Sequence, residues 1–86
     1  MEKDLLEAIA NDFQESDRAA AIRELESITL DHVMAQSAYN LRNTRFSVLY
    51  LAKGDLNELR TLTQSAKFDF RDVIMWATLD RRNENE

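Results

Sequence analysis

The side chains that could perform chemistry are few in this 86-residue sequence, and their spacing fits neither catalysis nor metal binding. The single histidine, His32, follows Asp31, and adjacent residues of a helix point about 100° apart, so the two cannot share a metal ion. No serine lies in a glycine-flanked nucleophile turn, and no glycine loop could hold a phosphate, because Gly54 is the only glycine. We therefore expect a protein that is not an enzyme and that uses no metal or cofactor.

A polar cluster in the middle of the chain is the best candidate for ligand recognition. It consists of Asn40, Arg42, Asn43 and Arg45. Paired guanidinium and amide groups of this kind could bind an anion or a phosphate. The two asparagines are also poor helix formers. They could instead form a polar layer that fixes the register of a bundle or of a dimer.

The charges are divided unevenly along the chain. Residues 1–31 contain nine acidic and three basic residues, whereas residues 32–54 contain no acidic residue and three basic ones. The simplest interpretation is internal pairing, in which the acidic N-terminal helices lie beside the basic middle of the chain. If Arg45 is buried, it requires a partner, for which we expect a carboxylate.

Apolar periodicity and capping residues predict an all-α fold. The absence of proline and the single glycine also favour helices over a sheet with many turns. We expect one domain over residues 1–86, a compact bundle of four to five helices, with a frayed tail at 83–86. The predicted helices span residues 2–13, 17–27, 30–53, 55 to about 66, and 70–81. Thr29 and Asp55 are the predicted N-caps of the third and fourth helices, and Gly54 is the predicted stop between them.

The predicted helix over residues 30–53 is the longest and is apolar on two sides. Its core stripe would contain Leu30, Val33, Met34, Ser37, Leu41, Thr44, Val48, Leu51 and Ala52. Tyr39, Phe46 and Tyr50 lie nearly opposite this stripe. Two interpretations remain open. The helix is either sandwiched between other helices of the bundle, or its aromatic side contacts a second chain.

The predicted helix over 70–81 repeats this two-sided pattern. One face contains Phe70, Val73, Ile74 and Ala77. The other contains Met75, Trp76 and Leu79. A chain of this length has few residues with which to cover both faces of two helices. We therefore predict an interface formed by Tyr39, Phe46, Tyr50 and Trp76, although each of these residues could equally belong to the core.

These features favour a protein–protein interaction or regulatory module, either a homodimer or the binding partner of an unidentified protein. The formal net charge of −5 disfavours nucleic acid and anionic membranes as partners. The alternative is a nucleic-acid-binding regulator that uses the basic window at 39–53 or the helix pair at 55–82. The chain contains no cysteine and no apolar run long enough to span a membrane, and its acidic start does not have the pattern of a signal peptide. We expect a cytoplasmic protein without membrane association.

Overall fold

The computed structural model describes residues 1–84, and the described chain is helical without strands. This confirms the predicted all-α bundle. The elements are α1 (Lys3–Asp12), α2 (Glu15–Glu26), the short 3₁₀ turns η1 (Leu30–His32) and η2 (Met34–Gln36), α3 (Ala38–Ala52), α4 (Leu56–Phe68) and α5 (Phe70–Glu84). The last two residues of the predicted frayed tail lie outside the described residues, and the first two belong to α5.

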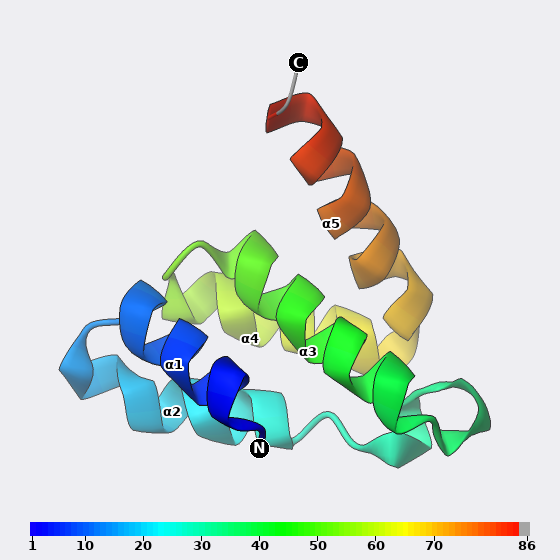
Figure 1. The fold of residues 1–86 in the computed structure, drawn as a ribbon, viewed down its shortest axis with the longest axis horizontal. Helices are drawn as coiled ribbons and strands as arrows, with labels where there is room; N and C mark the ends of the chain where they lie inside the picture. Colours follow the sequence, from blue (N-terminus) through cyan, green and yellow to red (C-terminus); the bar gives the residue numbers. More distant parts are fainter. Residues whose placement is uncertain (85–86) are drawn as a thin grey trace.

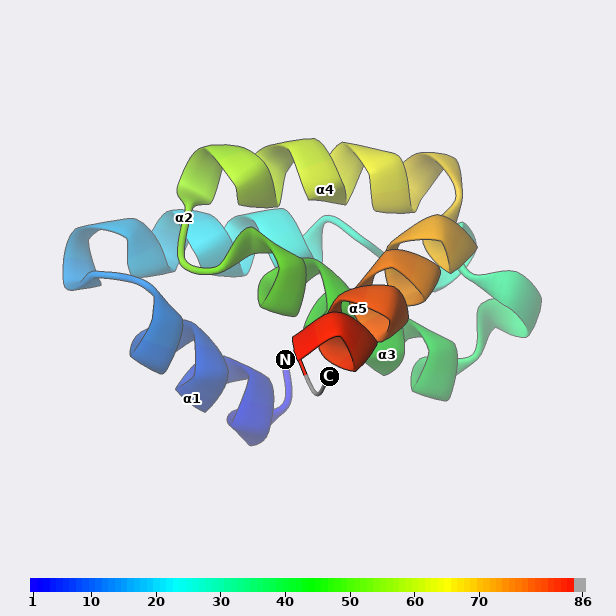
Figure 2. The same ribbon diagram turned by 90° about the horizontal axis from the view of Figure 1, so that it is seen from above.

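Helix α3 is the central element of the bundle, because it packs against both α4 and α5. Helix α2 packs against α1 on one side and α4 on the other. Figures 1 and 2 show α1 to α4 forming the body of the molecule, while α5 rises from it and carries the C-terminal end away. Helix α5 packs against α3 and α4, and its last turns extend beyond them.

The hydrophobic core is built from one face of each helix. Its buried members are Leu5, Ile9, Phe13, Ala21, Leu25, Ile28, Val48, Leu49, Ala52, Leu59, Ala66 and Val73. From the predicted core stripe of the third helix, Val33, Thr44, Val48 and Ala52 are buried. The hydroxyl of Thr44 donates to the backbone oxygen of Asn40 at 2.7 Å, which satisfies this buried polar group.

The third helix is shorter than predicted, because it begins at Ala38 and not near residue 30. The Ser37 hydroxyl caps it by accepting a hydrogen bond from the backbone N–H of Asn40 at 3.2 Å. Before this cap, Ala35 and Gln36 have left-handed backbones with φ of 57° and 49°, which a continuous α-helix cannot contain. The part of the predicted stripe before residue 38 consequently does not belong to this helix, although Val33 is buried as predicted.

The predicted cap residue Thr29 does cap a helical turn, but that turn is η1. The backbone N–H of Thr29 donates to Nδ1 of His32 at 2.9 Å, and the two residues form a reciprocal capping box. Leu30 and Met34, which the periodicity placed in the core, are 41% and 60% exposed. The apolar repeat continued through a segment whose backbone leaves the helix, and periodicity alone could not reveal this.

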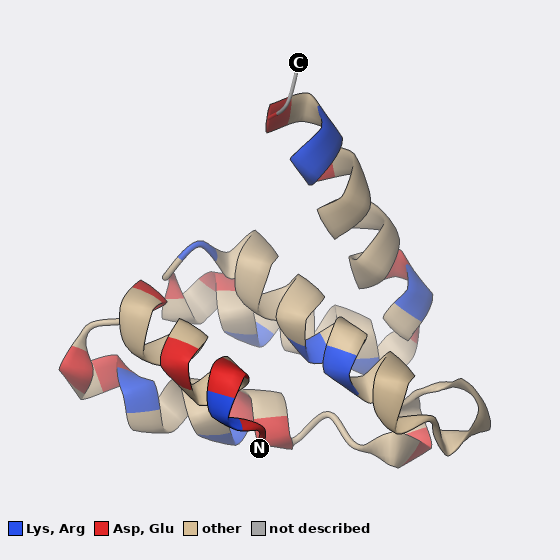
Figure 3. Cartoon of the chain, viewed as in Figure 1, with Lys and Arg blue, Asp and Glu red and all other residues tan. Residues whose placement is uncertain are grey.

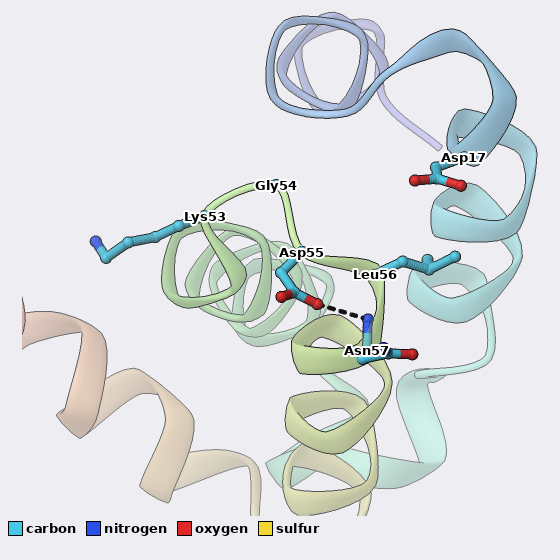
Figure 4. A pocket seen from close by; sticks show the side chains of 6 residues that line it. All are labelled: Asp17, Lys53, Gly54, Asp55, Leu56 and Asn57. Carbon is cyan, nitrogen blue, oxygen red and sulfur yellow. Dashed lines mark hydrogen bonds between the residues drawn. The ribbon is translucent and has the colours of Figure 1, made fainter.

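The predicted stop at Gly54 and the predicted cap at Asp55 are both confirmed. Gly54 has a φ of 80°, and a β-carbon there would overlap the backbone oxygen of Asp12 at the end of α1. The Asp55 carboxylate then accepts from the backbone N–H groups of Asn57 and Glu58 at 2.9 and 3.1 Å, as Figure 4 shows for Asn57. This turn makes α3 and α4 adjacent and places Gly54 directly against the end of α1.

None of the described helices combines the length and apolar character that crossing a membrane requires.

Candidate interaction surfaces

The exposed face of α5 has an apolar stripe formed by Met75, Trp76 and Leu79. These side chains are 52%, 39% and 48% exposed. Val73 and Ala77 of the same helix are fully buried against the body. Because each residue adds about 100° of rotation, Met75 and Leu79 lie about 120–160° around the helix from these buried residues. The stripe therefore faces away from the rest of the chain.

Charged residues occur at both ends of α5 but not between them. Residues 73–79 carry no charge, while Arg71 and Asp72 precede them and Asp80, Arg81 and Arg82 follow. Figure 3 shows this uncharged middle of the helix between two charged ends. Apolar contact area rimmed by charge is the usual composition of a protein interface.

A second surface is the hollow between α1, α3 and α5, with a volume of about 190 Å³. It is lined by Ala8, Asp12, Phe46, Leu49, Tyr50 and Arg81. The Arg81 guanidinium lies 4.5 Å from the centre of the Tyr50 ring, and that of Arg42 lies 4.8 Å from the centre of the Phe46 ring. Cations of this chain therefore already cover both aromatic rings.

Polar contacts of α3 hold the last turns of α5 above this hollow. The Tyr50 hydroxyl donates to the Glu84 carboxylate at 2.7 Å, which raises the pKa of Tyr50 above its ordinary value. The Lys53 ammonium donates to Asp80 at 3.1 Å and to Glu84 at 3.4 Å. The bond from Lys53, followed by that from Tyr50, lowers the pKa of Asp80. These contacts are exposed to solvent, so each contributes little to stability.

Within the polar cluster, Arg42 points toward the N-terminal helix. Its guanidinium forms ion pairs with Glu2 and Asp4, and these bonds lower the pKa of the Asp4 carboxyl. The predicted pairing of the acidic N-terminal helices with the basic middle is therefore found for Arg42 alone, because Lys53 pairs with Asp80 and Glu84 of α5. The side chain of Asn40 donates to the backbone oxygen of Met34 at 3.3 Å, and Asn43 is half-buried on the same helix.

Arg45 points toward α2 and caps its carboxyl end. Its guanidinium donates to the backbone oxygens of Leu25 and Ile28 at 3.0 and 2.8 Å. The Leu25 oxygen also accepts from the backbone N–H of Ile28 at 3.2 Å, and a cation is favoured at this end of the helix dipole. We expected a carboxylate partner for Arg45, whereas the hydrogen-bond acceptors are carbonyls. Burial lowers the pKa of Arg45, but an arginine stays protonated at any physiological pH.

The four predicted interface residues do not form one surface. Phe46 and Tyr50 line the same hollow, but Tyr39 lies at the other end of α3 and is 72% exposed. Trp76 lies outside the hollow, on the stripe of α5. Arg81 was not predicted to contribute to a site, because its position over Tyr50 depends on how α5 packs against α3 and no local pattern encodes that packing.

An open concavity at the turn between α3 and α4 is explained by the turn itself. It is lined by Asp17 and residues 53–57. Figure 4 shows that Asp55 is directed to the start of α4 and that Lys53 points away from it. Within residues 1–84, no three histidine or acidic side chains converge as metal ligands would.

Comparison of the chain with protein-family models, with curated proteins and with solved structures found no match. The geometry described above is therefore the basis for a functional proposal. Of the surfaces on the described chain, the stripe of α5 has the largest apolar side chains in adjacent exposed positions.

Proposed function

We propose that this protein is a non-enzymatic, cytoplasmic interaction module that binds a protein partner through the stripe of α5. The observation that carries the proposal is the exposure of Met75, Trp76 and Leu79 together on a helix that rises from the body (Figure 1). Water in contact with such a stripe is released when a partner covers it, which favours association.

The residue types of the stripe support a protein as the partner. Tryptophan is among the residues that contribute most to binding when buried in an interface, and methionine adapts its shape to a partner surface. Trp76 is the one residue of the predicted interface that lies on this stripe. It would act as the anchor.

Nucleic acid is a weaker candidate for the partner. Residues 32–54, which contain no acidic residue, owe their positive charge to Arg42, Arg45 and Lys53. In the folded chain Arg42 and Lys53 bind carboxylates, and Arg45 binds carbonyls of α2. Binding to phosphates would have to replace these internal contacts.

Site-directed photo-crosslinking tests the proposal. A photoreactive amino acid replaces Met75 on the stripe, and in a matched control it replaces the exposed Gln64 of α4. We expect covalent adducts with a protein chain in cells of the source organism from position 75 only. The substitution Leu79→Arg in the same chain should abolish them, because it puts a charge into the stripe.

Two outcomes would contradict the proposal. One is the absence of any adduct from position 75 beyond the amount seen from position 64. The other is adducts that persist unchanged with Leu79→Arg. An adduct with twice the mass of one chain identifies a second copy as the partner, and any other mass identifies a different protein.

A further inference from the structure

The stripe of α5 lies between two opposite charges that share its face. Asp72, Met75, Leu79 and Arg82 follow one another at spacings of three, four and three residues. This is the a and d spacing of a helix that packs along a partner helix. The stripe together with these two charged residues is called the α5 seam below.

Neither end of the α5 seam is neutralised within the chain. Arg82 is exposed and Asp72 is partly exposed. Over residues 1–84, three ion pairs involve this helix: Asp80 and Glu84 each pair with Lys53, and Arg71 pairs with Asp69, which precedes the helix. Asp72 and Arg82 form no ion pair within these residues. Both remain available to a partner.

We infer that the partner of the α5 seam is a second copy of this chain, bound with its own α5 antiparallel. This inference rests on the proposed function, since it names the protein that the stripe binds. Antiparallel pairing about a two-fold axis at position 77 brings Asp72 opposite Arg82 of the second copy, and Arg82 opposite its Asp72. The same axis brings Met75 opposite Leu79 of the second copy. One seam is thus complementary to itself, as a two-fold interface requires.

The charges select the antiparallel direction. A parallel pair in register would bring Asp72 against Asp72 and Arg82 against Arg82, and like charges in contact disfavour association. The antiparallel pair also brings the two Trp76 side chains together on one side of the axis, because this residue is one position from the axis. The apolar centre is then closed by an ion pair at each end.

The position of α5 leaves room for this pairing. The seam faces away from the buried Val73 and Ala77, and the helix rises from the body (Figure 1). Phe68, 93% exposed, ends α4 immediately before α5. In the sequence it precedes Asp72, the first residue of the seam, by four positions.

Sedimentation of the full chain over a concentration series provides the first test. We expect a dimer that Leu79→Glu converts to a monomer. Arg82→Glu should weaken the dimer by about tenfold, because two ion pairs become two repulsive contacts. The double variant Asp72→Arg with Arg82→Glu should recover the dimer. The control Arg60→Glu makes the same charge change on the exposed face of α4 and should leave the dimer intact.

Disulfide trapping tests the direction, and the chain contains no cysteine of its own. An equimolar mixture of the Asp72→Cys and Arg82→Cys variants should form a mixed disulfide dimer under oxidation. Neither variant alone should form a disulfide dimer. The two copies of position 72 would lie about 15 Å apart along the helix direction, as would the two copies of position 82, and this is beyond the reach of a disulfide. Efficient trapping by either variant alone would overturn the antiparallel arrangement.

The failure of this inference can be distinguished from that of the proposed function. A monomer at every concentration, or a dimer that Arg82→Glu weakens no more than Arg60→Glu does, overturns the antiparallel pair. In either case, adducts from position 75 with a different protein would still support the interaction module.

Discussion

Helix α2 and the second half of α5 are attached to the bundle by different kinds of contact. Helix α2 contributes the fully buried Ala21 and Leu25, and Arg45 binds carbonyl oxygens at its end. The second half of α5 is held mainly by exposed bonds to carboxylates, at Asp80 and Glu84. Buried contacts are insensitive to salt and acid, whereas exposed carboxylate contacts are sensitive to both.

This difference indicates a division of roles within a single small fold. Helix α2 belongs to the part of the molecule whose stability comes from burial. The second half of α5 is attached weakly enough to adjust when a partner covers its stripe.

The largest expected difference between the two helices is in core stability. Leu25→Ala should lower the free energy of unfolding by about 2–5 kcal/mol, because it leaves a cavity in the core. Leu79→Ala is the matched control on α5 and should change it by less than about 1 kcal/mol, since Leu79 is half exposed. Urea denaturation followed by circular dichroism, at a concentration where the chain is monomeric, measures both. Equal losses would contradict the contrast.

A smaller effect is expected from removing the cap of α2. Arg45→Met should cost about 1–3 kcal/mol of unfolding free energy, because two carbonyl oxygens at the helix end lose a charged donor. Arg82→Met on α5 removes the same charge from a side chain with no internal ion pair. This variant should change the free energy of unfolding by no more than about 0.5 kcal/mol. A loss for Arg45→Met no larger than this control would mean that water replaces the guanidinium without cost.

Acid should loosen α5 before α2. The pKa of Asp80 is lower in the folded chain than its ordinary value of 3.8, so the folded state binds fewer protons than the unfolded state in acid. The stabilisation from Asp80 is therefore complete above that ordinary value and is lost as the pH falls through the lowered one. Amide exchange protection at 80–84 should decrease over this range. Protection at 21–26 should persist, because carbonyls do not titrate, and simultaneous loss would contradict the comparison.

The smallest expected effect comes from one hydroxyl group. Tyr50→Phe removes the bond to Glu84 and should increase amide exchange in the last turn of α5 without a measurable change in the unfolding midpoint. Tyr39→Phe is the control, because Tyr39 is 72% exposed and lies at the other end of α3. If both variants behave alike, the Tyr50 bond does not hold the helix end.

The parts of the fold that local chemistry determines could be predicted from the sequence. Gly54 and Asp55 end one helix and begin the next through their own backbone and side chain, so both were predicted correctly. The predicted start of α3 was wrong, because Thr29 and Ser37 are both good N-cap residues and the apolar repeat continues through both positions. Tertiary packing, which selects between them, is not visible in a local pattern.

The candidate surfaces could be predicted only in part. The two-sided pattern of α5 identified Met75, Trp76 and Leu79 as a separate face, and the structure exposes them. Tyr50 and Phe46 belonged to one predicted face, but the sequence could not reveal that Arg81 of α5 covers the Tyr50 ring. This contact joins residues 31 positions apart, and it depends on the packing of whole helices.

The late start of α3 has a consequence for how the chain folds. In the unfolded chain, the apolar repeat favours a helix from residue 30 onward, whereas the native structure requires left-handed backbones at Ala35 and Gln36. A helix that nucleates at Thr29 must therefore unwind about two turns before Ser37 can cap α3. Local preference and native topology conflict in this segment, and such frustration slows the search for the native state.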